Sequence, residues 1–177
     1  MRKRLRERKS IAMGVYLKEF SPIKGAKGNQ KMTMLIERSH KAKSIYFEVY
    51  EDENDWKVYW NYEIGPDQFL PIMSQYANPK ITINEAFNNP QIISKISELS
   101  QTHIKVLNEN EIGIIQDLLN RGFPPVLGGM PQGLDGHSYI FTINGEENEY
   151  RSWRVLPKEW EHVKPVIEQL VNIAEMV

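Results

Sequence analysis

The stretch GLDGHSYIFTINGEENEYRSWRVLPKEW, residues 133–160, decides the fold that this sequence predicts. Apolar and aromatic residues dominate 137–143, and Asn144-Gly145 is a dipeptide typical of tight hairpin turns. A second extended run covers 150–156, after which Pro157 opens a segment with helical apolar spacing that continues to the chain end. The sequence therefore predicts a β-hairpin packed on a C-terminal helix.

Pro165 leaves two interpretations of this last helix open. In the first, the helix begins near Pro157 and kinks at Pro165, because an interior proline removes a backbone hydrogen bond. In the second, residues 157–163 form a separate turn and the main helix begins at Pro165, which suits the first turn of a helix.

Three runs upstream are rich in aromatic and β-branched residues and predict strands over 32–36, 44–50 and 55–64. The short polar link 51–54 predicts that the second and third strands form an antiparallel hairpin. The apolar residues of the third strand do not separate cleanly, but a period of two assigns its residues to two faces. The core-facing set is Trp56, Val58, Trp60, Tyr62 and Ile64, and the opposite set is Lys57, Tyr59, Asn61 and Glu63.

Weaker patterns fill the rest of the chain. Asn108 resembles an N-cap, Glu109 and Glu111 suit the positive end of a helix dipole, and Gly122 suits a helix end. The further predicted elements are strands over 10–20, 80–83 and 103–107 and helices over 68–76, 90–100 and 108–122. The predicted fold is α+β: a mainly antiparallel sheet of about five or six strands with helices packed against it.

Composition limits the possible classes of protein. The chain has 177 residues, of which 41% are hydrophobic and 25% charged, as is typical of a globular protein with a core. It has no cysteine, which excludes disulfides, thiolate metal sites and a cysteine nucleophile. No apolar run is long enough to span a membrane. Because Lys18 and Glu19 interrupt the apolar segment near the start, we expect no export signal and a cytoplasmic protein.

Charge divides the chain into a basic tail and an acidic body. Residues 1–9 carry six Lys or Arg and one Glu, and since the whole chain carries −1, residues 10–177 carry −6. We expect residues 1–9 to be a solvated, disordered tail and residues 10–177 to be a single domain. The alternative is a tail that attracts nucleic acid. The acidic body favours a basic protein partner over nucleic acid.

Groups that could carry chemistry are few. The four histidines, at 40, 103, 137 and 162, lack the spacing of metal ligands, so we expect no metal and no cofactor. Asp135, His137 and Ser138 combine a carboxylate, an imidazole and a hydroxyl, as hydrolases do. However, neighbouring residues of a strand point to opposite faces, and Asp135-Gly136 is explained as a turn before the strand. A hydrolase using Asp135 and His137 stays the alternative.

The C-terminal quarter resembles a pattern that recurs in small uncharacterised bacterial proteins. It consists of Asp-Gly, a small residue, an aromatic strand, a turn, a Trp-bearing strand and a terminal helix opened by Pro and Trp. The matching residues are Asp135, Gly136, Ser138, Tyr139, Phe141, Tyr150, Trp153, Pro157 and Trp160. Some proteins with this ending are candidate immunity proteins, which neutralise a toxin by binding it. The resemblance implies a cytoplasmic, acidic, non-enzymatic binder and carries over no catalytic residue.

Together these features predict a non-enzymatic protein-binding module, with an immunity protein that binds a basic toxin as the specific hypothesis. The expected contact surface is the acidic link of the predicted hairpin together with the glycine- and proline-rich loop 122–133. Its candidate binding residues are Glu51, Asp52, Glu53, Asp55, Met130 and Gln132. An ordinary polar hairpin turn is the alternative explanation of the four acidic residues.

Overall fold

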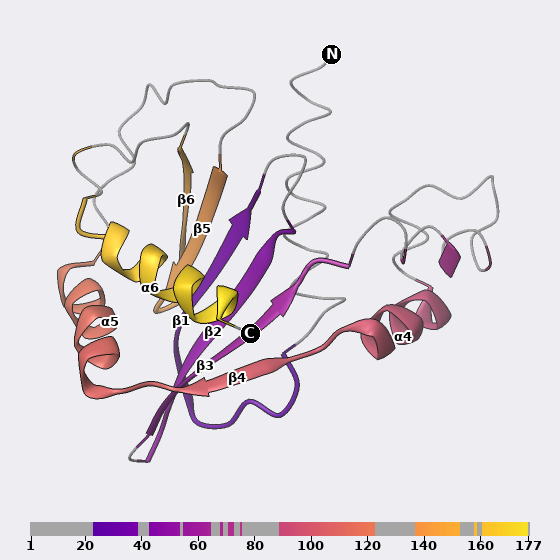
Figure 1. Ribbon diagram of the computed structural model, residues 1–177, viewed down its shortest axis with the longest axis horizontal. Coiled ribbons are helices and arrows are strands. Elements are labelled where there is room, and N and C mark those ends of the chain that lie inside the picture. The colour runs from indigo at the N-terminus through magenta and orange to yellow at the C-terminus, as the bar shows by residue number, and fades with distance from the viewer. Residues whose placement is uncertain are drawn as a thin grey trace.

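The computed structural model describes residues 23–38, 43–53, 55–64, 89–122, 137–152 and 161–176, together with 68, 71, 72, 75 and 158. These residues form an antiparallel six-stranded sheet with the order β4-β3-β2-β1-β5-β6 and three helices (Figure 1). The strands are β1 Asn29–Glu37, β2 Ile45–Asp52, β3 Asp55–Tyr62, β4 His103–Val106, β5 His137–Ile143 and β6 Glu146–Ser152. The helices are α4 Pro90–Leu99, α5 Glu109–Arg121 and α6 Lys164–Glu175. The predicted α+β class is confirmed.

One face of the sheet carries the main core. The backbone register places Phe47 directly between Met34 and Trp60, and Phe141 lies beyond Met34 on β5. All four side chains are 0–1% exposed. Helices α5 and α6 contribute the apolar residues that pack against them, which are Ile115, Leu118, Val163, Val166, Ile167, Leu170 and Ile173. Burial of this apolar area is the main force that holds the helices on the sheet.

The alternation predicted for β3 is confirmed on this face, since Trp56, Val58 and Trp60 are all buried. The opposite face is also buried in part, because Tyr59 is 4% exposed and Asn61 is 0% exposed. Burial of the Asn61 amide is tolerated because its Nδ2 donates a hydrogen bond to Ser100 Oγ at 3.2 Å. Polarity alone therefore does not identify the solvent-facing side of this strand.

Two turns join neighbouring strands as the sequence predicts. Strands β2 and β3 pair as an antiparallel hairpin, with Asp52 opposite Asp55 and a left-handed backbone at Glu53 (φ 49°). Strands β5 and β6 turn at Asn144 (φ 52°) and Gly145 (φ 81°), which are the positive angles that favour Asn-Gly. Strand β6 begins at Glu146, four residues before the predicted extended run.

Gly28 lies where the chain enters β1, and a Cβ atom there would collide with the backbone oxygen of Glu51 on β2. Gly25 is a matched control, since it also has a positive φ (75° against 100°), but apart from its chain neighbours no described residue has an atom within 4 Å of its Cβ position. We expect Gly25→Ala to cost about 1 kcal/mol of unfolding free energy, for the left-handed backbone alone. Gly28→Ala should cost roughly 3 kcal/mol, because the backbone of β2 must also move. Urea denaturation measures both, and equal losses would contradict this packing.

The helix boundaries agree with the capping signals in the sequence. Asn89 caps α4 by accepting a hydrogen bond from the backbone N–H of Gln91, and α5 begins after Asn108 and ends at Gly122. Helix α6 begins at Lys164 with Pro165 in its first turn, as the second interpretation predicted, and 161–163 form a turn before it, whereas 157, 159 and 160 lie outside the described residues. The four described residues of the predicted helix 68–76 are helical. The strands predicted over 10–20 and 80–83 lie outside the described residues.

The first turn of α5 contains a carboxylate, that of Glu111, which accepts two hydrogen bonds. Glu111 Oε2 accepts from the backbone N–H of Asn108 at 2.9 Å, and Glu111 Oε1 accepts from Lys105 Nζ at 2.5 Å. In return, Asn108 Oδ1 accepts from the backbone N–H of Glu111 at 3.0 Å. Burial raises the pKa of Glu111, but the hydrogen bonds from Lys105 and Asn108 and the charge of Lys105 outweigh burial and hold this pKa below its ordinary value.

Because the pKa of Glu111 is lower in the folded chain, its ionised form stabilises the fold above pH 4.5, and this contribution is lost as the pH falls through the folded pKa. Glu111→Gln keeps a side chain that can complete the capping box but removes the charge. We expect this variant to be less stable than the wild type by about 1 kcal/mol at pH 7, and we expect the difference to shrink as the pH falls to about 3. Urea denaturation at both pH values measures the difference, and a pH-independent difference would contradict the assignment.

Candidate protein-binding surface

The tip of the β2–β3 hairpin carries the four acidic residues that the sequence predicted to bind a partner. Two of them are neutralised. Glu51 Oε2 lies 2.5 Å from Lys31 Nζ, and the hydrogen bond from this lysine lowers the pKa of Glu51. Asp52 Oδ2 lies 3.1 Å from Lys57 Nζ, and this contact raises the pKa of Lys57.

The other two acidic residues of the tip, Glu53 and Asp55, are exposed. The tip is thus less negative than the sequence alone indicates. Met130, Gln132 and Asp135 lie outside the described residues, as do all residues from 123 to 136, which include the predicted loop 122–133 except Gly122. His137 begins β5, but its side chain is outside the described part, so the approach of Asp135 to His137 stays a prediction.

A polar cluster on the sheet face opposite α6 was not predicted. Glu48 accepts hydrogen bonds from the hydroxyls of Tyr46 at 2.9 Å and Tyr50 at 2.8 Å, and Gln30 Nε2 donates to the Tyr50 hydroxyl at 3.0 Å. Burial, the hydrogen bond to Glu48 and its charge raise the pKa of Tyr50 to about 12. Burial and Glu48 raise the pKa of Tyr46 as well. Phenols that stay protonated and already donate to a carboxylate stabilise the sheet and offer no base at neutral pH.

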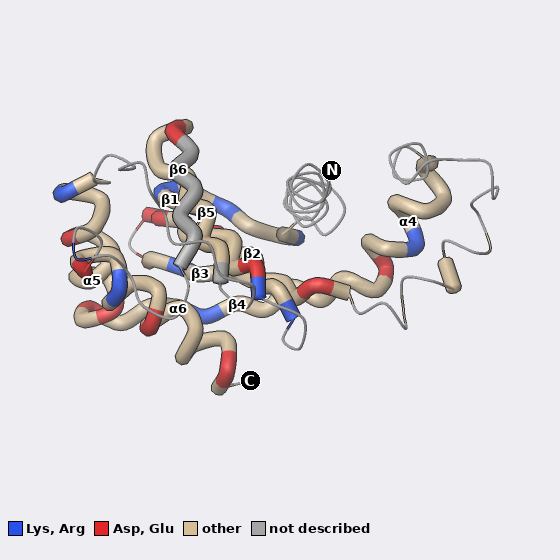
Figure 2. The backbone as a smooth tube through the Cα atoms, turned by 90° about the horizontal axis from the view of Figure 1, so that it is seen from above, with Lys and Arg blue, Asp and Glu red and all other residues tan. Residues whose placement is uncertain are grey.

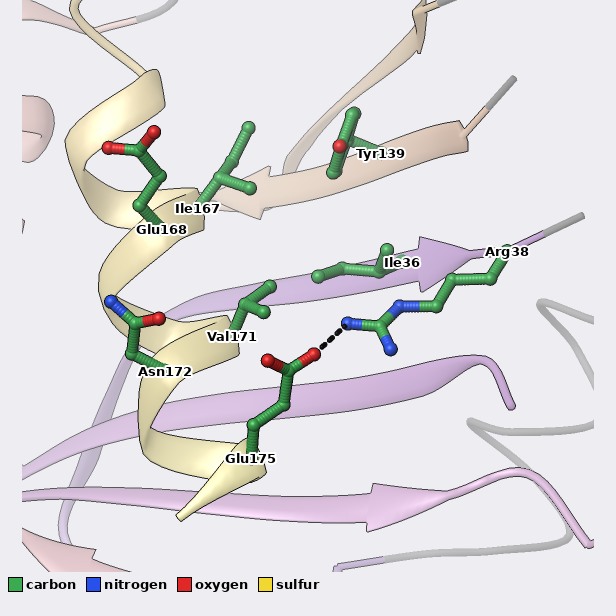
Figure 3. Close-up of a pocket in the computed structure, with 8 residues that line it drawn as sticks. All are labelled: Ile36, Arg38, Tyr139, Ile167, Glu168, Val171, Asn172 and Glu175. Carbon is green, nitrogen blue, oxygen red and sulfur yellow. Dashed lines mark hydrogen bonds and ion pairs between the residues drawn. The ribbon is translucent and has the colours of Figure 1, made fainter. Parts of the chain in front are cut away.

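A groove of about 470 Å³ lies between α6 and the ends of β1 and β5 (Figure 3). Its floor is apolar, with Ile36, Ile167 and Val171, and its polar rim includes Arg38 and Glu175, whose Nη2 and Oε1 atoms are 3.2 Å apart. The other lining residues are Tyr139, Glu168 and Asn172. Burial raises the pKa of Tyr139, and the charge of nearby Arg38 opposes this.

The charges of the groove are largely compensated, because Glu168 also lies 3.5 Å from Lys164. No nucleophile paired with a base is present among the eight lining residues. The groove therefore offers neither a net charge nor a reactive pair that would select a ligand.

The edge strand β4 exposes apolar side chains. Among the described residues, the large hydrophobic side chains that are exposed are Ile104 at 56%, Val106 at 54%, Leu99 at 46% and Met176 at 77%. The first three fall within the eight residues from Leu99 to Val106, at the end of α4 and along β4. Ile104 and Val106 are neighbours on one face of β4, and adjoining exposed apolar side chains indicate an interaction site more strongly than a single one does.

The alternate residues of β4 point to the other face and are held there. The His103 ring stacks on Trp60 with centroids 5.3 Å apart, and Lys105 pairs with Glu111. In both views β4 runs between α5 on one side and α4 on the other, and the tube of both helices shows basic and acidic segments (Figures 1 and 2). We define the edge surface as Leu99, Ile104, Lys105 and Val106.

The sequence predicted a strand over 103–107 but gave no reason to treat it as an interaction site. The alternation of His103 and Lys105 with Ile104 and Val106 is ordinary for a half-buried strand. Only the order of the described strands places β4 at the edge of the sheet, and only the exposure of Ile104 and Val106 shows that its apolar side faces solvent.

In the described ranges, no cluster of three or more His, Cys, Asp or Glu residues could hold a metal ion. No helix of the same ranges is long and apolar enough to cross a membrane. Comparison of the chain with protein-family models, with curated proteins and with solved structures finds no match.

Proposed function

We propose that this chain is a non-enzymatic protein-binding module and that its edge surface contacts the partner. The observation that carries the proposal is the exposure of Ile104 and Val106, both above 50%, on the last strand of the sheet. Exposed apolar side chains on a strand that forms the edge of the described sheet favour association with another chain.

The specific form of the proposal is an immunity protein that neutralises a toxin in the cytoplasm. Two features support it: the resemblance of the C-terminal quarter and the net charge of −6 on residues 10–177. A net negative body attracts a basic partner over distances of about 8 Å at physiological salt and raises the association rate. The contact itself then depends on the apolar side chains of the edge surface.

The test is capture of a partner by the tagged full chain from a lysate of the source cells, combined with co-expression of the neighbouring gene's product. We expect the tagged chain to retain one protein in near-equimolar amount. We also expect the toxicity of that protein to be suppressed in cells that produce it together with this chain. Retention of no protein above background contradicts the binding function. Retention of a partner that is harmless when expressed alone contradicts the immunity hypothesis only.

A further inference from the structure

We propose that β4 binds an extended segment of the partner as an added strand of the sheet, with apolar partner residues against Ile104 and Val106 and an acidic residue facing Lys105. This inference rests on the proposed function and specifies its mode of binding. It follows from the backbone of β4, from its two faces and from the charge of its central residue.

The backbone of β4 offers hydrogen-bonding groups away from the sheet. The N–H of Leu107 donates to the carbonyl of Trp56 at 2.8 Å, so the backbone of Leu107 faces β3. Backbone groups alternate sides along a strand, so Lys105 also faces β3 while Ile104 and Val106 face outward. Among the described residues, none beyond β4 in the sheet order pairs with these outward groups.

The side chains of the same two residues are available to an added strand. Ile104 and Val106 lie on one face of β4 and are 56% and 54% exposed. The strand contains no proline, and its pairing with β3 shows no register shift, so neither a missing N–H nor a bulge obstructs the edge. An incoming strand with apolar residues at alternate positions would cover both side chains at once.

The charge of Lys105 favours a strand from another protein over a strand from a second copy of this chain. An antiparallel pair of two β4 strands that uses the outward groups of both Ile104 and Val106 places Lys105 directly opposite Lys105 of the other copy. Like charges opposite each other destabilise a strand pair, and a lysine on an edge strand is a known protection against self-association. Lys105 Nζ already contacts Glu111 Oε1 and its side chain is 35% exposed, so an acidic partner residue would share the three ammonium donors of this lysine with Glu111.

The probe is a synthetic peptide, acetyl-Thr-Val-Glu-Val-Thr-amide, added to the isotopically labelled full chain and followed by NMR. Its two valines match Ile104 and Val106, and its glutamate matches Lys105. We expect saturable shifts of the Ile104 and Val106 amide resonances at millimolar peptide, with slower hydrogen exchange of these two amides. The same peptide with a central lysine should bind roughly fivefold more weakly.

Four results would overturn the inference: no shift at about 10 mM peptide, shifts centred on the groove at Tyr139 and Asn172, equal binding of the two peptides, or dimerisation through β4 without peptide. A pair of variants separates the inference from the proposed function. Ile104→Pro removes the outward N–H, whereas Ile104→Thr keeps it. If a captured partner binds both variants equally, strand addition is wrong and protein binding stands. If no partner is captured, the proposed function fails, while the peptide titration still decides whether the edge accepts a strand.

Discussion

Phe47→Ala is expected to lower the free energy of unfolding by about 3–5 kcal/mol, the largest single loss of stability that we predict. Phe47 is 0% exposed and lies at the centre of the sheet, with Met34 on β1 and Trp60 on β3 directly beside it. Truncation leaves a cavity beneath α6 that these rigid neighbours cannot fill. Urea denaturation followed by tryptophan fluorescence and by far-UV circular dichroism measures the change.

Ile104→Ala is the matched control, since it removes an apolar side chain from the same sheet at a position that is 56% exposed. We expect it to cost about 1 kcal/mol or less, because little apolar area returns to water. A loss at Ile104 as large as that at Phe47 would mean that the main core does not lie on the face that α5 and α6 cover.

Local features of the fold were predictable because each depends on a few neighbouring residues. Asn108 and Glu111 form the capping box of α5, and Asn144-Gly145 supplies the two positive φ angles of a tight turn. The onset of α6 was left open because a proline is compatible with either a kink or a first turn. Packing determines where α6 begins. Val163, just before the helix, and Val166, in its first turn, are both 0% exposed.

Non-local features could not be predicted from periodicity. The pairing of β1 with β5 joins segments more than a hundred residues apart, and it fixes which strands become edges. The ion pairs of the β2–β3 hairpin also escaped prediction. Lys31 lies at the irregularity in the β1–β2 register between Gln30 and Met32, and its contact with Glu51 changes the charge of the expected contact surface.

Ile104→Asp combined with Val106→Asp is expected to weaken binding of the captured partner at least 30-fold, the largest functional effect that we predict. Two carboxylates would have to be desolvated beside the partner's apolar side chains, and hot-spot positions of interfaces cost about 2 kcal/mol or more each when disrupted. Because both side chains are exposed in the free chain, stability should change little. Titration calorimetry measures the affinity, and thermal unfolding checks the fold.

Glu53→Lys combined with Asp55→Lys is the matched control on the surface that the sequence predicted. This variant also changes two exposed positions, but these positions lie at the tip of the β2–β3 hairpin and not on β4. We expect an affinity within about threefold of the wild type at physiological salt, from a change in association rate. If this variant abolishes binding while the Ile104 and Val106 variant does not, the hairpin tip is the contact surface.

Hydrogen–deuterium exchange of the full chain, free and saturated with the captured partner, tests the central claim most directly. Our account predicts that protection on binding is concentrated at 99–107, with the largest slowing at the outward amides of Ile104 and Val106. Protection confined to the hairpin tip at 51–55 or to the groove beside α6, with exchange at β4 unchanged, would contradict it.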